Sequence, residues 1–299
     1  MRAVRFHQFG DLDVLQVDEV PIPEPGPGQI RIAVRAVGVN PADWKVIEGE
    51  LGGDLPLGVG IDAAGVVDAL GEGVTDVAVG DAVVGVTSAG LADFAVLLAW
   101  VPIPEGLDVV AAAALPLAAE TATRGIDLLG VGAGTTLLIN GAAGAVGSIA
   151  TQLSVLRGAR VIATASERNA GRLRGYGAEP TTYGPGLAER VAQIAPDGVD
   201  VIFDMAPPGA LPELVVIAGT PDRVLTVSDF ETAPSLGVRV SGREGTEYRW
   251  DAIGTVVDLA AEGKLELPVE RTFPFEEFRE AERISKAGHV TGKLVVVID

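Results

Sequence analysis

The amino-acid sequence predicts an α/β protein with a β-rich domain and a domain built on a doubly wound parallel sheet. Three observations lead to this prediction. Short valine-rich segments, in which apolar and polar residues alternate, dominate the first third of the chain. From about residue 135 to residue 227, strand-like and helix-like segments follow one another in turn. A glycine-rich turn, GAAGAVG at residues 141–147, joins the first of these strands to the first helix.

The β-rich region is predicted to be small and mostly antiparallel. Residues 29–37 alternate between apolar and polar side chains, as a half-buried strand does. They follow a proline-rich segment, PIPEPGPGQ, which can form neither a helix nor a central strand. Two more short strands are expected at GVVDAL (residues 65–70) and GDAVVGV (residues 80–86), separated by glycine and aspartate turns.

The alternating region is predicted to form a parallel sheet with right-handed crossovers. Strands are expected at residues 135–140, 160–165, 200–204 and 223–227, and helices at residues 146–156, 169–176 and 187–195. After this region we expect two helices, at residues 250–262 and 275–286, and a closing strand at residues 292–298.

The composition excludes several classes of site and partner. The 299 residues include no cysteine, which rules out disulfides, iron–sulfur clusters, thiolate catalysis and cysteine-ligated zinc. The two histidines, His7 and His289, lie at opposite ends of the chain, so we expect no metal site. The net charge of −19 disfavours nucleic acids and anionic membranes as partners. With no signal-peptide pattern and no apolar stretch long enough to cross a bilayer, we expect a soluble cytoplasmic protein.

The glycine-rich turn matches the dinucleotide-binding fingerprint, with alanine at the first glycine position. Small residues are needed there because the turn is tight, the backbone approaches a pyrophosphate and the helix packs closely on its strand. The helix N-terminus then directs free N–H groups at the phosphates. The alternative is a purely structural glycine turn, but its place between an apolar strand and a helix favours a cofactor site. The predicted site consists of Gly141, Ala142, Ala143, Gly144, Ala145, Val146 and Gly147.

The residues after the second strand of this region predict which nicotinamide cofactor is used. In NAD sites an acidic residue about 20 positions after the fingerprint binds the ribose 2′-hydroxyl. Here Ser166 stands 166 − 147 = 19 positions after Gly147, Glu167 is one place later, and Arg168 follows. A neutral residue followed by a cation predicts NADPH, although Ser166 can also act as a helix N-cap.

Several motifs together show a family resemblance that runs essentially from end to end. The motifs that carry it are NPADWK (residues 40–45), GIDAAG (residues 60–65), INGAAGAVGSIATQL (residues 139–153) and HVTGKLVVVID (residues 289–299). In these motifs the chain resembles the zinc-free medium-chain dehydrogenase/reductase family, in particular its quinone oxidoreductase, or zeta-crystallin-like, branch. The resemblance implies a GroES-like catalytic domain at residues 1–120 and 250–299, and a Rossmann NADP-binding domain at residues 121–249. It also implies an active site in the cleft between the two domains and a homodimer.

The resemblance also implies roles for single residues. Asn40 and Asp43 would face the nicotinamide, and Thr121 would lie under it. Ser166, Arg168 and Tyr183 would lie where relatives bind the 2′-phosphate. The remaining cofactor contacts implied are Val227, Ser228 and Lys293, and the candidates for a direct chemical role are Asn40, Asp43 and Lys45.

Two features weigh against carrying these roles over directly. Asn40, Pro41 and Asp43 also suit the cap, first and third positions of a helix, which is a purely structural explanation of NPADWK. The chain also departs from many relatives, because Asn169 stands where they have lysine. The three tyrosines of the chain are Tyr176, Tyr183 and Tyr248, so none follows NPADWK as a proton donor.

Physical chemistry favours quinones and enones as the acceptors at a metal-free site. Reducing a ketone makes an alkoxide, whose conjugate acid has a pKa of ~16, whereas a quinone gives a phenolate-like anion with a pKa of ~10. The difference corresponds to roughly 8 kcal/mol of charge stabilisation that a metal would otherwise supply. We therefore expect an NADPH-dependent quinone or enone oxidoreductase. The alternatives are an enoyl reductase acting on carrier-bound thioesters, against which the charge of −19 weighs, and a non-catalytic NADPH-binding protein.

Overall fold

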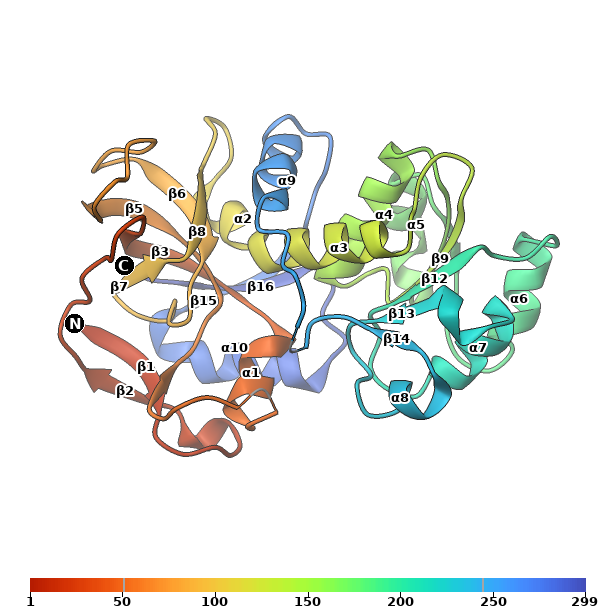
Figure 1. Cartoon of the computed structure of the whole chain (residues 1–299), viewed down its shortest axis with the longest axis horizontal. Helices are drawn as coiled ribbons and strands as arrows, with labels where there is room; N and C mark the ends of the chain where they lie inside the picture. Colours follow the sequence, from red (N-terminus) through yellow and green to blue (C-terminus); the bar gives the residue numbers. More distant parts are fainter. Residues whose placement is uncertain (51, 244) are drawn as a thin grey trace. The chain divides into compact units, whose positions relative to one another are not determined.

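The chain forms two compact units in a computed structural model that describes residues 1–50, 52–243 and 245–299 (Figure 1). The first unit combines Met1–Leu117 with Trp250–Asp299, and the second is Ala118–Arg249. Both ends of the chain therefore belong to one unit, and the second unit is inserted between them. No helix within the described ranges has the length and apolarity that a membrane span needs.

The first unit contains a seven-stranded sheet centred on β3 (Ile30–Val39), which confirms the strand expected after the proline-rich segment. The sheet order is β15-β16-β3-β5-β6-β8, and β7 also pairs with β3. All pairs are antiparallel except β15 with β16. Figure 1 shows the late strand β16, in blue, beside the early strand β3, in orange. The other strands are β5 (Asp62–Leu70), β6 (Ala82–Val86), β7 (Phe94–Leu97), β8 (Ala99–Pro102), β15 (Val269–Pro274) and β16 (Lys293–Val297).

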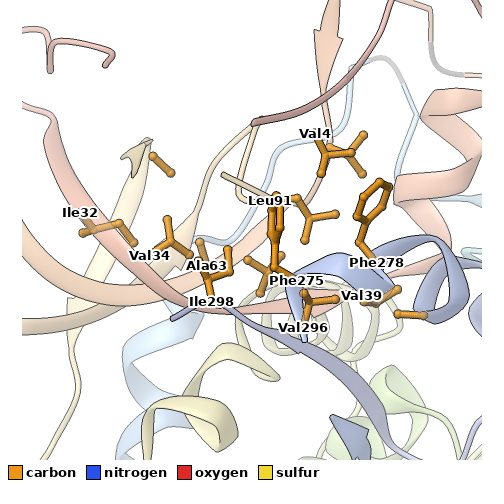
Figure 2. Packing of buried hydrophobic residues seen from close by; sticks show 14 of the residues in the cluster. Val4, Ile32, Val34, Val39, Ala63, Leu91, Phe275, Phe278, Val296 and Ile298 are labelled. Carbon is orange, nitrogen blue, oxygen red and sulfur yellow. The ribbon is translucent and has the colours of Figure 1, made fainter. Parts of the chain in front are cut away.

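A small antiparallel sheet and several helices belong to the same unit. The sheet has the order β2-β1-β4, and its strands are β1 (Arg2–Phe6), β2 (Gln16–Glu19) and β4 (Leu57–Gly58). The helices are α1 (Pro41–Ile47), α2 (Val109–Ala113), α9 (Ala252–Ala261) and α10 (Phe278–Ala287). Figure 2 shows the core between them, where Ile32 and Val34 of β3 lie with Val296 of β16 and with Phe275 and Phe278. The core thus joins segments from both ends of the chain.

The second unit is a six-stranded sheet in which every pair of neighbouring strands is parallel. Its order is β11-β10-β9-β12-β13-β14, which is the 3-2-1-4-5-6 order of the doubly wound dinucleotide-binding fold. The predicted parallel sheet is therefore confirmed. The strands are β9 (Thr136–Asn140), β10 (Arg160–Thr164), β11 (Glu179–Thr181), β12 (Val201–Asp204), β13 (Val224–Thr226) and β14 (Arg239–Val240).

Helices pack on both faces of this sheet because alternate residues of each strand point to opposite sides. Leu138 and Ile202 are register partners, and they belong to a core cluster shared with the helices α6 and α7. Phe203, the next residue along β12, faces α3, where a Cβ at Gly125 would lie 2.0 Å from its ring. The helices are α3 (Pro116–Leu128), α4 (Ala145–Leu156), α5 (Ala170–Gly175), α6 (Leu187–Ile194), α7 (Leu211–Ala218) and α8 (Ala233–Leu236).

Several elements were not predicted from the sequence, among them β1 and β15 of the first unit. The helix expected at residues 169–176 is confirmed as α5 (Ala170–Gly175), which follows a 3-10 turn at Glu167–Asn169. Helix α7 was not predicted. Its sequence LPELVVIA is nearly continuous in apolar residues, so it lacks the polar face that identifies an amphipathic helix.

Candidate functional site

The glycine-rich turn leads directly from β9 into α4, and two of its glycines are required by packing. Gly141 adopts φ +89°, a left-handed backbone conformation that residues other than glycine rarely adopt. A Cβ at Gly147 would lie 2.3 Å from the carbonyl oxygen of Gly141 and 2.7 Å from the Cα of Ala142. Gly147 therefore allows the first turn of α4 to approach the end of β9.

Gly144 differs from these two glycines, because the described residues leave the space in front of it open. It is the N-cap of α4, and a Cβ there would meet a single atom within 4 Å, the carbonyl oxygen of Gly141 at 3.7 Å. Residues 143–146 are partly exposed. The N–H groups of the first turn of α4 have no acceptor within the helix. This arrangement fits the pyrophosphate of a dinucleotide, which the N-terminus of a helix binds favourably.

Beneath the turn, the carboxyl ends of four neighbouring strands are tied together by buried polar side chains. Asn140 Nδ2 donates a hydrogen bond to Asp204 Oδ1 at 2.8 Å, and Thr226 Oγ1 donates to Asp204 Oδ2 at 2.8 Å. Thr164 Oγ1 donates to Asn140 Oδ1 at 2.6 Å and accepts from the Gly141 N–H at 3.1 Å. Burial raises the pKa of Asp204 to about 6. This network was not predicted from the sequence, although each of the four apolar strands ends in a polar residue.

Val227 and Ser228 follow β13 at the same edge of the sheet. The Val227 N–H donates to the carbonyl oxygen of Asp204 at 3.1 Å, and the Ser228 N–H donates to Thr226 Oγ1 at 3.2 Å. The network therefore fixes the backbone of this turn. Their roles as cofactor contacts stay predictions.

The segment after β10 surrounds a small pocket. The pocket has a volume of about 30 Å³, and Ser166 lies on its wall. Arg168 and Tyr183, the other two residues predicted there, are exposed, Tyr183 by 57%. The residues assigned to the 2′-phosphate thus lie on the 3-10 turn after β10 and on the loop after β11.

Thr121 lies on α3 beside a buried ion pair. Its hydroxyl donates to Glu120 Oε2 at 3.2 Å, and Arg124 Nε donates to Glu120 Oε1 at 2.6 Å. The backbone N–H of Arg249 also donates to Glu120 Oε1, at 3.0 Å. Glu120 is fully buried, so its carboxylate is balanced by these donors rather than by water.

In the first unit, the NPADWK segment begins a helix and takes part in a buried ionic cluster. The Asn40 N–H donates to Asp43 Oδ2 at 2.7 Å at the start of α1, which confirms the capping interpretation of Asp43. Asn40 Nδ2 donates to Asp62 Oδ2 at 3.0 Å, and Lys293 Nζ donates to Asp62 Oδ2 at 2.9 Å and to Asn40 Oδ1. All four side chains are at most 4% exposed. The polar atoms of Asn40 and Lys293 therefore bond one another, and their roles as cofactor contacts stay predictions.

The carboxylates of this cluster outnumber its cation. Burial raises the pKa of Asp43 to about 7. It also raises the pKa of Glu282 on α10 well above its usual value, and the nearby charge of Asp43 adds to that shift. Among the residues that the structure describes, none donates a hydrogen bond to either carboxylate oxygen of Glu282. Lys45, the remaining catalytic candidate, points its Nζ over the ring of Trp44, 5.6 Å from the ring centroid.

The donor set of a zinc site does not fit this chain. There is no cysteine, and the part of the chain that the structure describes contains no group of three His, Asp or Glu side chains able to hold a metal ion. The residues present are consistent with the zinc-free branch of the family.

Comparisons with known proteins give the same fold and family. Residues 26–95 match the alcohol dehydrogenase GroES-like domain, and residues 176–296 match the zinc-binding dehydrogenase family. The "Chloroplast envelope quinone oxidoreductase homolog" of Arabidopsis thaliana is 29% identical over 331 residues, which cover 99% of this chain and 98% of that protein. The "NADPH-dependent alkenal/one oxidoreductase, chloroplastic" of the same plant is 30% identical and covers 99% of this chain, which spans 79% of it.

A third relative is much longer than this chain. The "Mycocerosic acid synthase-like polyketide synthase" of Mycobacterium tuberculosis is 33% identical over 96% of this chain, but the match spans 15% of the synthase. This chain is therefore similar to one region of a large multidomain enzyme.

Solved structures agree with the sequence comparisons. The quinone oxidoreductase from Coxiella burnetii is 29% identical with a TM-score of 0.85, and the alignment covers 100% of this chain and 99% of that one. An NAD-dependent alcohol dehydrogenase is 30% identical with a TM-score of 0.86 and full coverage of both chains. The GroES-like domain and the doubly wound sheet are thus confirmed. The chain belongs to the medium-chain dehydrogenase/reductase superfamily, in its quinone oxidoreductase branch.

Proposed function

We propose that this protein is a metal-independent, NADPH-dependent oxidoreductase that transfers hydride to a quinone or an α,β-unsaturated carbonyl compound. The observation that carries the proposal is the geometry of the glycine-rich turn. Gly141 and Gly147 are required by packing, whereas Gly144 faces open space at the N-terminus of the twelve-residue helix α4. Gly141 and Gly147 shape the turn, and Gly144 leaves the space at the start of α4 open to a phosphate group.

The chain's own residues would bind and orient the cofactor. The free N–H groups at the start of α4 would bind the pyrophosphate. The network of Asn140, Thr164, Asp204 and Thr226 would keep the turn and the Val227–Ser228 backbone in place without moving when the cofactor binds. Such preorganisation lowers the free-energy cost of binding and of orienting the reacting atoms. Bound NADPH supplies the hydride and its two electrons, and we assign the accompanying proton to solvent.

The class of hydride acceptor follows from the kind of substrate anion that the residues of this chain can stabilise. The chain has no cysteine, and its described residues offer no zinc donor set, so the anion that forms on the substrate must be delocalised. Quinones and enones give phenolate-like and enolate anions, which need less stabilisation than an alkoxide. The names of the two Arabidopsis relatives, a quinone oxidoreductase homologue and an alkenal/one oxidoreductase, support this class.

One observation favours a second candidate, an enoyl reductase acting on carrier-bound thioesters. The matching region of the polyketide synthase is 33% identical to this chain, and the match covers 96% of this chain. The net charge of −19 weighs against it, because an acidic carrier domain would be repelled.

The test is a spectrophotometric screen of NADPH oxidation against quinones, enones and enoyl thioesters. We expect turnover of quinones or enones and little or none of thioesters. Turnover of thioesters alone would replace the proposal with the second candidate. Tight NADPH binding without any turnover would instead identify a non-catalytic NADPH-binding protein.

A further inference from the structure

The buried network at the carboxyl edge of the parallel sheet has a fixed hydrogen-bond direction. Its side chains, those of Asn140, Thr164, Asp204 and Thr226, are at most 2% exposed. Thr164 Oγ1 donates to Asn140 Oδ1 at 2.6 Å, which leaves the Asn140 amide nitrogen to donate to Asp204 Oδ1 at 2.8 Å. Thr226 Oγ1 donates to Asp204 Oδ2 at 2.8 Å, and the Ala206 N–H donates to Oδ1 at 3.4 Å. The donors on both sides therefore point toward the Asp204 carboxylate.

The two threonine hydroxyls of this network also hold the backbone of two turns. Thr164 Oγ1 accepts from the N–H of Gly141, the first residue of the glycine-rich turn, at 3.1 Å. Thr226 Oγ1 accepts from the N–H groups of Ser228 and Asp229, both at 3.2 Å. The bonds that end at Asp204 thus orient the acceptors for the glycine-rich turn and for the turn after β13.

A proton on Asp204 is incompatible with this arrangement. It would make one carboxylate oxygen a donor, yet both Asn140 Nδ2 and Thr226 Oγ1 already donate to that carboxylate. A hydroxyl has one proton and two lone pairs, and Thr226 Oγ1 uses all three, so it can accept the new proton only by releasing a backbone N–H. The Asn140 amide can accept it only by turning over, which places Nδ2 against Thr164 Oγ1 and removes the acceptor of that hydroxyl. In either case a hydroxyl that supports one of the two turns loses a bond.

The surroundings of Asp204 place its titration in mildly acidic solution. Burial raises the pKa of Asp204 to about 6, the hydrogen bonds from Asn140 and Thr226 oppose this shift, and the negative charge of Asp229 adds to it. The helices α3 and α7, which pack against β12, carry charged side chains with partners of their own. These pairs are Glu120 with Arg124, Asp127 with Arg157, and Glu213 with the Ala188 N–H.

We propose that Asp204 is a positioning residue whose ionised carboxylate keeps the glycine-rich turn and the turn after β13 in the arrangement that binds a dinucleotide, so that a proton on Asp204 weakens this binding. The inference rests on the proposed function and deepens it, because it adds a regulation of the same site by pH. Its sign is opposite to the effect of the overall charge. The net charge of −19 becomes less negative as the pH falls, which by itself favours an anionic ligand.

The experiment is calorimetric titration of the whole protein with NAD⁺ between pH 5 and pH 8. NAD⁺ is chosen because it lacks the 2′-phosphate, a monoester that itself titrates near pH 6. We expect the affinity to be nearly constant from pH 8 to pH 7 and to fall by up to about tenfold at pH 5, the limit for one group with a pKa of about 6. Titrations at pH 6 in two buffers of different ionisation enthalpy should show the release of about half a proton on binding.

Variants of the network separate the charge of Asp204 from a merely structural role. Asp204→Asn resembles the protonated form, so it should bind NAD⁺ about tenfold more weakly at pH 7, with no proton release and no further loss at pH 5. Thr226→Val removes a donor to the carboxylate and should move the midpoint of the affinity profile to higher pH, whereas Thr226→Ser should keep the wild-type midpoint. Glu282→Gln, which removes a buried carboxyl group from the other unit, is the matched control and should keep the wild-type profile.

The outcomes distinguish this inference from the proposed function. Affinity that stays constant or rises on acidification, or the same proton release in Asp204→Asn, would overturn the role of Asp204 and leave the proposed function standing. If Asp204→Asn does not fold, which circular dichroism shows, the wild-type profile and its proton release decide. If NADP⁺ binds but NAD⁺ does not, the difference between the NADP⁺ profiles of wild type and variant decides, because the phosphate titrates in both. If neither nucleotide binds at any pH, the proposed function fails as well.

Discussion

Lys293 and Asp62, which are 231 residues apart in the sequence, form a buried ion pair in which Nζ lies 2.9 Å from Oδ2. Asn40 bonds to both partners. Asn40 belongs to NPADWK, Asp62 to GIDAAG and Lys293 to HVTGKL, so three motifs of the family meet in one cluster. A Cβ at Gly38 would lie 2.9 Å from Lys293 Cε, so the backbone of β3 closes against the same cluster. The cluster ties β3, β5 and β16 together within the first unit.

Replacing Lys293 with methionine should strongly destabilise the protein. The substitution leaves the buried Asp62 carboxylate without its cation, and breaking such a pair costs about 3–5 kcal/mol. Urea unfolding followed by circular dichroism measures the change. Lys264→Met, at an exposed lysine, is the matched control and should change the free energy of unfolding by less than about 0.5 kcal/mol. A Lys293→Met protein as stable as this control would show that the ion pair contributes nothing.

The stability of the protein should fall as the pH rises from about 4 to about 7. The pKa of Asp43 is 3.8 in an unfolded chain and about 7 in the folded protein, and that of Glu282 is raised in the same direction. Between the two values for Asp43 the folded state binds more protons than the unfolded state, so the free energy of unfolding decreases as the pH rises through this range. The cation facing these groups is Lys293, and Asp62 adds a further negative charge.

Asp43→Asn should flatten this pH dependence while keeping an acceptor for the Asn40 N–H. Glu282→Gln should act in the same way, because it removes the other buried carboxylate. Thermal unfolding midpoints at several pH values between 4 and 8 would measure the slope. Asp76→Asn, at an exposed position, should keep the wild-type slope. Equal slopes in all four proteins would mean that both carboxyls titrate normally.

Two glycines of the same turn should respond to substitution in opposite ways. Gly144→Val should weaken NADPH binding at least tenfold, about 1.4 kcal/mol, and leave the fold intact, because the new side chain occupies the open space in front of α4. Gly147→Ala should instead lower the free energy of unfolding, because its Cβ would lie 2.3 Å from the Gly141 carbonyl oxygen. Calorimetry and urea unfolding measure the two effects. If a folded Gly144→Val protein bound NADPH as tightly as wild type, the turn would have only a structural role.

Chelators should leave the NADPH-driven reduction of a quinone unchanged. The chain has no cysteine, and no metal-binding group of side chains is found in the described ranges. Activity before and after treatment with EDTA, together with elemental analysis of the purified protein, checks this. Stoichiometric zinc whose removal abolishes activity would contradict the assignment to the zinc-free branch.

Local features of the sequence were sufficient to predict the doubly wound sheet and the glycine-rich turn that joins its first strand to a helix. The strand at residues 135–140, the turn at residues 141–147 and the helix that follows are contiguous, and each has its own signal. An apolar run, a cluster of small residues and an apolar face with helical spacing each arise from interactions within a few residues. These patterns can therefore be recognised in the sequence before it is known which other segments pack against them.

The polar contacts were decided by the tertiary structure, because their members are distant in sequence. The glycine-rich turn that begins directly after Asn140 can be recognised from the local sequence. The hydrogen-bond partner of the Asn140 amide cannot, because it is Asp204, 64 residues later. In the same way, Lys293 forms an ion pair with Asp62 because their strands, β16 and β5, both pair with β3. Burial then sets the chemistry, since the same carboxyl groups would have ordinary pKa values in water and shift only where the packed sheets and helices exclude it.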